Sequence, residues 1–278
     1  MILLDGKRIA TKIKDELKAE ISSLSQKPKL SVILVGEDPA SQVYVGHKEK
    51  ACAQIGMESE VIRLSASSSQ DELEQLIEKL NSDSKTHAIL LQLPLPKTLD
   101  AFSAIEKISP SKDADCLTAY NQGLLALGRP LVKPCTPAGV IEMLKANDID
   151  IAGKEAVVIG RSNIVGKPMA QLLLNENATV TICHSKTKDL KAHCLKADIL
   201  VAAAGIPHLI DSSFIKEGAS VVDVGIHRQE GKLIGDVNPF AMDEKAFALS
   251  PVPGGVGPMT IAGLLKNTLL LFKASKLN

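Results

Sequence analysis

The sequence contains no tryptophan, and aromatic residues make up only 3% of its 278 residues. Proteins that bind single-stranded nucleic acid use such rings as platforms on which the bases stack. The chain also carries no excess of charge, because its 32 basic side chains balance 32 acidic ones. A protein that follows a phosphate backbone needs a basic surface. These two absences argue against nucleic acid as a partner.

Long apolar segments are also missing. The first residues, "MILLDGKRIATKIKDEL", become polar after a short apolar start, which does not fit a secretory signal. The longest apolar segment near the C-terminus, "IAGLLKNTLLLF", is interrupted by Lys266 and Asn267 and is too short to span a bilayer. We therefore expect a cytoplasmic protein that does not enter a membrane.

Cysteines are few, and no two of them form a CxxC pair: Cys52, Cys116, Cys135, Cys183 and Cys194. Scattered thiols of this kind are typical of a reducing cytosol rather than of a disulfide framework. Two neighbouring pairs, Cys183–His184 and His193–Cys194, have a spacing that matches no common zinc pattern. We expect buried thiols and no metal site.

Short apolar runs alternate with helical patterns along nearly the whole chain. The runs "LSVILVG" (30–36), "ESEVIRL" (58–64) and "EAVVIG" (155–160) have the length and composition of buried strands. Residues 69–81 repeat apolar side chains at helical spacing, and Ser69 stands where a cap belongs. Such alternation predicts parallel sheets covered by helices. The chain is long enough for two domains.

A group of prolines marks the predicted boundary between these domains. Within "GRPLVKPCTPAG", Thr136 followed by Pro137 has the sequence of a helix start. The last helix, predicted over 261–272, follows a second Gly/Pro cluster and is expected to return to the first domain. We predict two α/β lobes with a cleft between them. The first comprises 1–135 completed by 259–278, and the second is a Rossmann-like, doubly wound parallel sheet formed by 136–258.

A modified dinucleotide-binding turn follows the apolar run at the start of the second lobe. The standard fingerprint places glycines at positions 160, 162 and 165. This chain has Gly160, Ser162 and Val165, and Gly166 comes one position late. The turn is therefore either an ordinary surface turn or a phosphate-binding turn of altered geometry.

The end of the next strand favours the second interpretation. An acid there would bind the ribose hydroxyl of NAD, but residues 184–188, "HSKTK", contain none. Arg161, together with nearby hydroxyl groups, can hold a phosphate dianion instead. The sequence thus predicts NADP rather than NAD.

The first lobe contains three polar motifs. Tyr44 and Lys48 are four residues apart, which places them on one face of a predicted helix. Gln92 ends a buried run, "LLQLPLP", where a polar amide needs a partner. Asp113 and Asp115 follow in a predicted loop. Taken singly, these motifs also fit an ordinary helix face, an amide satisfied by backbone and a solvated turn.

Taken in order, these segments resemble the methylenetetrahydrofolate dehydrogenase/methenyltetrahydrofolate cyclohydrolase family over essentially the whole chain. The most specific are "VVIGRSNIVGKPMAQLL" and "PVPGGVGPMT", and "YVGHKEKACAQIGM", "LLQLPLP" and "KDAD" agree as well. The resemblance implies that NADP⁺ oxidises 5,10-methylenetetrahydrofolate to the methenyl form, which water then opens to 10-formyltetrahydrofolate. It also implies a homodimer.

The same resemblance assigns a role to each motif. Lys48 would transfer protons during ring opening, Gln92 would orient it, and Tyr44 would stack on the folate. Asp115 would bind the pterin. The residues implied for NADP binding are Gly160, Arg161, Ser162, Ser185 and Ile226. Those implied to shape the folate pocket are Gly254, Gly255 and Pro258.

One position departs from the family pattern. The family usually has glycine after the pterin aspartate, where this chain has Cys116. If the backbone there has a positive φ, a cysteine costs roughly 1–2 kcal/mol. We expect an altered but active site. Two rival hypotheses are a dehydrogenase without cyclohydrolase activity, which Lys48 disfavours, and a non-catalytic NADP sensor, which would not need the four catalytic side chains.

Overall fold

The computed structural model describes residues 1–242 and 245–277, which divide into two compact units. Unit 1 comprises Met1–Thr11 and Pro134–Gly263, and unit 2 comprises Lys12–Lys133 and the residues from Leu264 on. The division falls within two long helices, α1 (Gly6–Ser22) and α9 (Val256–Ala274). Across the described ranges, no helix combines the length and apolar character that a membrane span requires.

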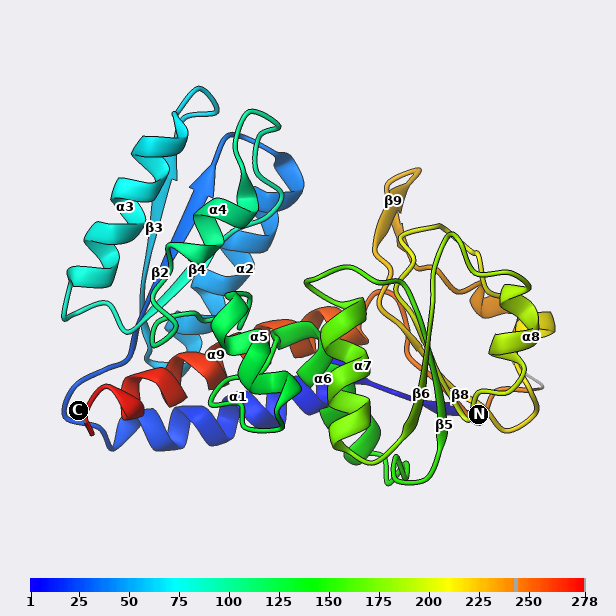
Figure 1. Ribbon diagram of the computed structural model, residues 1–278. Helices are drawn as coiled ribbons and strands as arrows, with labels where there is room; N and C mark the ends of the chain where they lie inside the picture. The colour runs from blue at the N-terminus through cyan, green and yellow to red at the C-terminus, as the bar shows by residue number, and fades with distance from the viewer. Residues whose placement is uncertain (243–244, 278) are drawn as a thin grey trace. The chain divides into compact units, whose positions relative to one another are not determined.

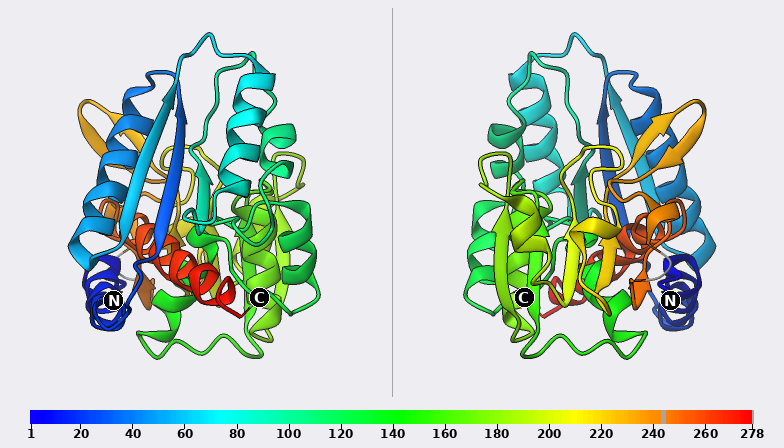
Figure 2. Two further views of the ribbon diagram at one scale, coloured as in Figure 1. Left: turned by 90° about the vertical axis from the view of Figure 1, so that its left-hand side faces the viewer. Right: turned by 90° about the vertical axis from the view of Figure 1, so that its right-hand side faces the viewer.

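Unit 2 is built on a three-stranded parallel sheet with the strand order β3-β2-β4. Its strands are β2 (Lys29–Val35), β3 (Glu58–Leu64) and β4 (Ala88–Leu91). Figures 1 and 2 show α2 on one face of this sheet and α3 and α4 on the other. The helices of this unit are α2 (Pro39–Ile55), α3 (Gln70–Ser82), α4 (Ala101–Glu106) and α5 (Ala119–Ala126).

Helix α3 forms where the sequence predicts it. The Ser69 side chain accepts a hydrogen bond from Glu72 N at 3.2 Å, and the Glu72 side chain accepts one from Ser69 N at 2.9 Å. This reciprocal cap satisfies amides that the first helical turn would otherwise leave unpaired. Leu73, Ile77 and Leu80 are buried against the sheet. The prediction over 69–81 is therefore confirmed.

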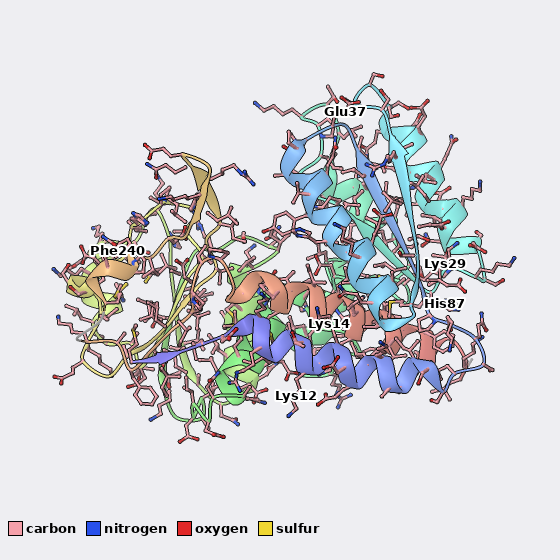
Figure 3. All side chains as sticks on the ribbon, turned by 180° about the vertical axis from the view of Figure 1, so that it is seen from behind. Lys12, Lys14, Lys29, Glu37, His87 and Phe240 are labelled. Atoms are coloured by element: carbon pink, nitrogen blue, oxygen red, sulfur yellow. The ribbon has the colours of Figure 1, made fainter. Side chains whose placement is uncertain are left out.

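The amino-terminal ends of β2 and β4 are tied together by Lys29 and His87, which lie side by side in Figure 3. Lys29 N donates to His87 Nδ1 at 3.0 Å, and Lys29 Nζ lies 2.9 Å from Glu60 Oε1. Burial lowers the pKa of His87, so the ring is neutral and can accept this bond. This end of the sheet is fixed by structural contacts, while Gln92, one of the candidate catalytic residues, follows the other end of β4.

Unit 1 contains a six-stranded sheet in which every pair is parallel, with the order β1-β11-β8-β7-β5-β6. The chain runs from β5 to β6 on one side and then crosses to β7 and β8 on the other. This is the doubly wound arrangement that the sequence predicts. The strands are β1 (Ile2–Leu3), β5 (Glu155–Ile159), β6 (Thr179–Cys183), β7 (Ile199–Ala202), β8 (Ser220–Asp223) and β11 (Ala248–Leu249).

Three helices and several shorter elements complete unit 1. The helices are α6 (Cys135–Lys145), α7 (Gly166–Asn175) and α8 (Leu190–Cys194). An antiparallel hairpin joins β9 (His227–Gln229) to β10 (Lys232–Ile234). Two single turns of 3₁₀-helix are η1 (Ser212–Phe214) and η2 (Pro239–Ala241).

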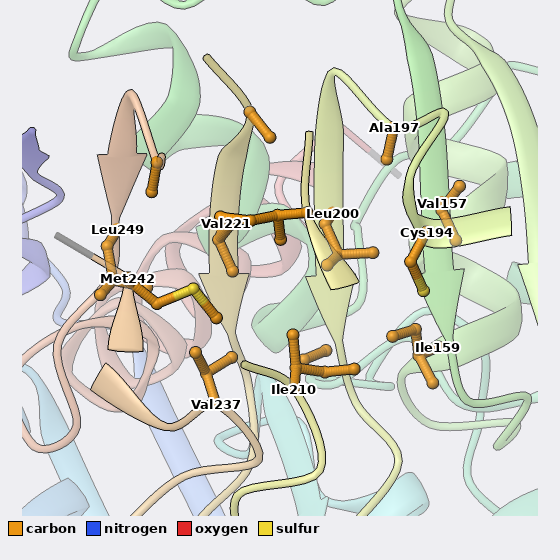
Figure 4. Close-up of a cluster of buried hydrophobic side chains, with 14 of the residues drawn as sticks. Val157, Ile159, Cys194, Ala197, Leu200, Ile210, Val221, Val237, Met242 and Leu249 are labelled. Atoms are coloured by element: carbon orange, nitrogen blue, oxygen red, sulfur yellow. The ribbon is translucent and has the colours of Figure 1, made fainter. Parts of the chain in front are cut away.

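One face of the six-stranded sheet carries a continuous apolar core. Figure 4 shows Val157, Leu200, Val221 and Leu249, one from each of four strands, in a row, with Met242 beside Leu249 and Val221. All five side chains are almost completely buried. Because the strands are buried on both faces, they read in the sequence as uninterrupted apolar runs.

Two predicted helix starts are wrong. Helix α6 begins at Cys135, and no side chain caps it, so Thr136 lies inside the helix with its Oγ1 2.9 Å from Thr260 Oγ1. Helix α9 begins at Val256 rather than at 261. Pro137 and Pro258 both fall in a first helical turn, where the missing N–H has no partner to lose. Pro137 therefore stands at the third position of α6 rather than at the first, and Pro258, which was expected before α9, stands within it.

The five cysteines are free and buried, as predicted. Burial raises the pKa of Cys52 to about 11. A thiol with so high a pKa is protonated at neutral pH and behaves as a small apolar side chain.

Candidate active site

Helix α2 presents Tyr44 and Lys48 on one face. Asp38 caps the helix by accepting a hydrogen bond from Ser41 N at 2.8 Å, and Pro39 occupies the first turn. Both Tyr44 and Lys48 are half-buried. Burial raises the pKa of Tyr44, so its ring remains a neutral phenol. Such a side chain offers an apolar face with one polar tip.

The Lys48 ammonium is held by Gln92. Lys48 Nζ donates to Gln92 Oε1 at 2.7 Å. Gln92 follows β4 directly, and its backbone N donates to Ile33 O at 2.9 Å. Its side-chain Nε2 donates to Leu93 O at 2.6 Å, which turns the amide oxygen towards the lysine. The sequence therefore correctly indicated that this amide has a partner.

The choice of an amide rather than a carboxylate has a chemical consequence. A carboxylate beside Lys48 would stabilise the ammonium and make its proton hard to remove. A neutral amide oxygen accepts the same hydrogen bond without adding a full negative charge. The Gln92 contact thus fixes the position of Lys48 Nζ through a neutral acceptor.

The two aspartates of the "KDAD" loop have different environments. Asp113 is buried, and its carboxylate accepts hydrogen bonds from Thr118 N, Thr118 Oγ1 and Asn121 Nδ2, each at 2.9 Å. These contacts make Asp113 a structural clamp for the loop. Asp115 is half-buried and is therefore the one of the two whose carboxylate can meet a ligand.

The residues on both sides of Asp115 are fixed by side-chain amides. Cys116 has a φ of 56°, so its backbone has the left-handed conformation that is unfavourable for a residue other than glycine. Gln122 Nε2 donates to Cys116 O at 2.5 Å. Asn267 Nδ2, from α9, donates to Ala114 O at 2.9 Å. These bonds, together with the complete burial of the Cys116 side chain, offset the cost of the left-handed backbone.

Gln122 and Asn267 were not identified from the sequence. Gln122 lies on α5 in an unremarkable polar position. The sequence gives one indication of Asn267, because it is a polar residue inside the apolar segment "IAGLLKNTLLLF". In the structure its side chain is 5% exposed. A buried amide of this kind requires partners, but the pattern alone did not say which ones.

The turn after β5 requires glycine at two positions. Gly160 has a φ of 122°, and a Cβ there would stand 2.1 Å from Ala203 O. A Cβ on Gly166 would stand 2.2 Å from Gly160 O. Gly166 therefore allows the close packing of helix on strand that the third glycine of the standard fingerprint provides.

Ser162 builds this turn in place of the second glycine. Its Oγ accepts hydrogen bonds from Val165 N at 3.2 Å and Gly166 N at 3.3 Å, and its carbonyl accepts one from Lys167 N at 3.0 Å. The hydroxyl thus holds two amides at the start of α7, whose N-cap residue is Val165. Arg161 and Ser162 are both exposed at the carboxyl end of β5.

Ser185 lies at the corresponding place on the neighbouring strand. Strands β5 and β6 pair Ile159 with Cys183, so Arg161 and Ser185 each stand two residues beyond the same register pair. The turn is closed by His184 N, which donates to Thr187 Oγ1 at 2.8 Å. Ser185 is exposed. The structure therefore brings Arg161 and Ser185 to one edge of the sheet.

Ile226 and the glycine-rich segment are neighbours in unit 1. Ile226 follows β8 and is 43% exposed, and its Cδ1 lies 3.9 Å from where a Cβ on Gly257 would stand. Gly254 has a φ of 106°, and a Cβ on Gly255 would stand 2.6 Å from Pro251 O. These positions admit only glycine. Pro258, in the first turn of α9, is half-buried.

Comparison with known families gives two matches. A family model described as "Tetrahydrofolate dehydrogenase/cyclohydrolase, catalytic domain" matches residues 4–115. A second, described as "Tetrahydrofolate dehydrogenase/cyclohydrolase, NAD(P)-binding domain", matches residues 134–276.

Individual proteins resemble the chain over nearly its full length. The bifunctional protein FolD of Geotalea daltonii is 55% identical over 271 residues, covering 96% of this chain and 97% of that protein. The crystal structure of the bifunctional enzyme FolD from Campylobacter jejuni has a TM-score of 0.95 at 49% identity, covering 100% and 99%. The Trypanosoma brucei dehydrogenase-cyclohydrolase, solved with NADP cofactor and inhibitor, has a TM-score of 0.96 at 40% identity, covering 100% and 99%.

Proposed function

Because the chain belongs to the tetrahydrofolate dehydrogenase/cyclohydrolase family, we propose that Lys48 and Gln92 perform the ring-opening half of a two-step folate reaction. The chain is an NADP-dependent dehydrogenase and a cyclohydrolase. It oxidises 5,10-methylenetetrahydrofolate to 5,10-methenyltetrahydrofolate and hydrolyses that product to 10-formyltetrahydrofolate. The observation that carries the residue assignment is the 2.7 Å bond from Lys48 Nζ to Gln92 Oε1.

The first step is a hydride transfer from the methylene carbon that bridges N5 and N10 of the folate to the nicotinamide of NADP⁺. It leaves a methenyl cation delocalised over the two nitrogens. Tyr44 packs its ring on the folate, and Asp115 accepts two parallel hydrogen bonds from the amino-pyrimidine edge. Both residues hold the reacting carbon in place and do not exchange protons with it.

The second step consumes one water molecule and needs proton transfer. Water adds its oxygen to the methenyl carbon, and the neutral Lys48 amine accepts the proton that this oxygen loses. As the carbonyl of the formyl group forms, the C–N5 bond breaks and N5 takes up a proton. The cationic substrate near Lys48 lowers the stability of the ammonium and so favours the amine. One proton is released overall.

We assign folate binding to the predicted first domain, 1–135 with 259–278, and NADP binding to 136–258. Tyr44, Lys48, Gln92 and Asp115 support the first assignment because all four belong to unit 2. The second is supported by the glycine turn of unit 1. The proposed cofactor contacts are Gly160, Arg161, Ser162, Ser185 and Ile226, and Gly254, Gly255 and Pro258 are proposed to shape the folate pocket.

The selectivity for NADP is expected to depend on Arg161. An Arg161→Ala variant should raise the KM for NADP⁺ roughly 10- to 100-fold, because it removes a charge-assisted bond to the 2′-phosphate. The KM for NAD⁺, which lacks that phosphate, should change less than about twofold. Steady-state dehydrogenase assays with each coenzyme measure both values. Arg63→Ala, which removes an exposed arginine of unit 2, is the control. An equal effect on both coenzymes would contradict the role of Arg161.

The protein is proposed to be a cytoplasmic homodimer. At the edge strand β1, Leu3 and the preceding Met1 are each 56% exposed, and Phe247, which precedes the paired strand β11, is 49% exposed. Exposed apolar side chains along a sheet edge favour association with a second copy. Light scattering should then give twice the 29.5 kDa of one chain. The five free thiols fit a reducing compartment.

The two activities are tested directly by following absorbance. Methylenetetrahydrofolate with NADP⁺ should produce NADPH and the methenyl intermediate, and added methenyltetrahydrofolate should disappear without any coenzyme. A trace that stays flat in both assays would favour a non-catalytic NADP sensor instead.

A further inference from the structure

Two buried carboxylates hold the loops that follow β7 and β8. Asp236 is completely buried, and its Oδ2 accepts hydrogen bonds from Ala204 N at 2.6 Å and Gly205 N at 2.9 Å. Asp223 is 3% exposed, and its Oδ1 accepts one from Gly225 N at 2.9 Å. Both loops lie at the carboxyl ends of their strands, which is the edge where doubly wound sheets bind ligands.

Asp236 has one further partner, the ring of His227 at the start of β9. His227 Nε2 lies 2.7 Å from Asp236 Oδ1, and the histidine side chain is 20% exposed. Both carboxylate oxygens of Asp236 are thereby hydrogen-bonded. Oδ2 bonds to the loop after β7, and Oδ1 bonds to His227, which follows Ile226 in the chain. The histidine is the solvent-facing end of this chain of contacts.

Ile226 is consequently fixed on both sides. Gly225 before it is bonded to Asp223, and His227 after it is bonded to Asp236. A Cβ on Gly225 would stand 2.2 Å from Asp236 Oδ1, so the backbone of Gly225 lies directly against this carboxylate. The two carboxylates are themselves linked, because Asp236 N donates to Asp223 Oδ1 at 2.9 Å.

The β7 loop also contacts the glycine turn after β5. The carbonyl oxygen of Ala203 lies only 2.1 Å from where a Cβ on Gly160 would stand. Strands β5 and β7 are adjacent, and the chain changes direction between them. In such a sheet the adenosine lies over the second strand and the pyrophosphate over the first turn. The nicotinamide then extends over the loops after β7 and β8.

We propose that His227 and Asp236 are positioning residues that set the nicotinamide side of the NADP site. This inference rests on the proposed NADP site of the same unit. Through one carboxylate the pair aligns Ala204 and Gly205 with Ile226, so that both loops present a single surface to the nicotinamide ring. Neither residue takes part in hydride transfer.

Removing the histidine donor has a definite physical effect. Oδ1 of Asp236 would remain buried with one hydrogen bond fewer, and such a group shifts until it finds water or another donor. Any shift of Asp236 moves the amides of Ala204 and Gly205 with it. The adenosine side, which depends on the turns after β5 and β6, keeps its own contacts.

The experiment compares NADPH with a fragment that lacks the nicotinamide, adenosine 2′,5′-bisphosphate. His227→Leu removes the donor, and His227→Ala is a second truncation in case leucine does not fit. His227→Gln keeps a neutral nitrogen donor at similar reach. Lys216→Leu is the matched control, because Lys216 Nζ donates at 2.6 Å to Asp198, whose other oxygen also holds a backbone amide. NADPH affinity is measured by the enhancement of its fluorescence, and fragment affinity by calorimetry.

His227→Leu and His227→Ala should weaken NADPH binding roughly 5- to 20-fold, while His227→Gln and Lys216→Leu stay within about twofold. The KM for NADP⁺ should rise and the KM for methylenetetrahydrofolate should not. Fragment binding should be unchanged in all four variants. Unchanged NADPH binding by a folded His227→Leu or His227→Ala protein would overturn the proposal, as would equal losses for NADPH and fragment. If the unaltered protein fails to bind the fragment, the proposed NADP site itself is wrong.

Discussion

A Lys48→Met variant is expected to lose at least about 100-fold of its cyclohydrolase activity, because positioned proton transfer contributes about 10²- to 10⁴-fold. Dehydrogenase activity should remain within about tenfold, since hydride transfer needs no proton from this amine. The two assays are the loss of methenyltetrahydrofolate without coenzyme and the formation of NADPH. The expected size rests on the proposal that Lys48, whose Nζ donates to Gln92 Oε1 at 2.7 Å, is the base of this reaction.

Two further variants separate charge from proton transfer. Lys48→Arg keeps a positive charge but cannot act as a base, since arginine does not lose its proton in proteins. It should therefore fail in the cyclohydrolase assay as Lys48→Met does. Lys50→Met, an exposed lysine on the same helix, should leave both activities unchanged. Full cyclohydrolase activity in a folded Lys48→Met protein would show that another group transfers the proton.

A Gly160→Ala variant is expected to lose NADP binding by more than about 100-fold, because the new Cβ would stand 2.1 Å from Ala203 O. The φ of 122° adds backbone strain that alanine cannot relieve. Either the β5 turn or the β7 loop has to move, and both belong to the proposed cofactor site. NADPH fluorescence titration measures the loss directly.

Gly153→Ala distinguishes this clash from the strain of a positive φ. Gly153 has a φ of 72°, and nothing lies within 4 Å of where its Cβ would stand. That variant should lose about 1 kcal/mol of stability and bind NADPH normally. Equal NADPH affinity in both variants would mean that the contact between Gly160 and Ala203 is not needed for the cofactor.

The two large effects should also be separable. The residues proposed to open the ring, Lys48 and Gln92, belong to unit 2, and hydrolysis does not use coenzyme. A folded Gly160→Ala protein should therefore still hydrolyse methenyltetrahydrofolate. Lys48→Met should show the opposite pattern. The pair of variants therefore assigns one activity to each set of residues.

Elements with strong local signals were predictable from the sequence. The central strands β2, β4, β5, β7 and β8 are buried along almost their whole length, so they appear in the sequence as apolar runs. Helix α3 carries both its cap and its apolar stripe within its own residues. The start of α6 was mispredicted because Thr136 before a proline has the sequence of a cap, although the helix already begins at Cys135. The start of α9 was mispredicted because a Gly/Pro cluster fits both before a helix and within its first turn.

Contacts between residues that are far apart in the chain could not be predicted from the sequence. Asn267 holds Ala114, and His227 meets Asp236 only because a hairpin folds between them. The pairing of β1 with β11 joins the first residues of the chain to a strand near its end. Helical or strand periodicity contains no information about such contacts. They follow from tertiary packing, which a single sequence does not display.

Lys48 is proposed to act on the same carbon that NADP⁺ oxidises. A crystal structure with NADP⁺ and a non-reactive analogue of methylenetetrahydrofolate tests it most directly. Lys48 Nζ should lie within about 3–3.5 Å of the bridging carbon or its nitrogens, still bonded to Gln92, with the nicotinamide on the same carbon. A complex in which Lys48 Nζ points to solvent, away from the bridging carbon, would contradict the account.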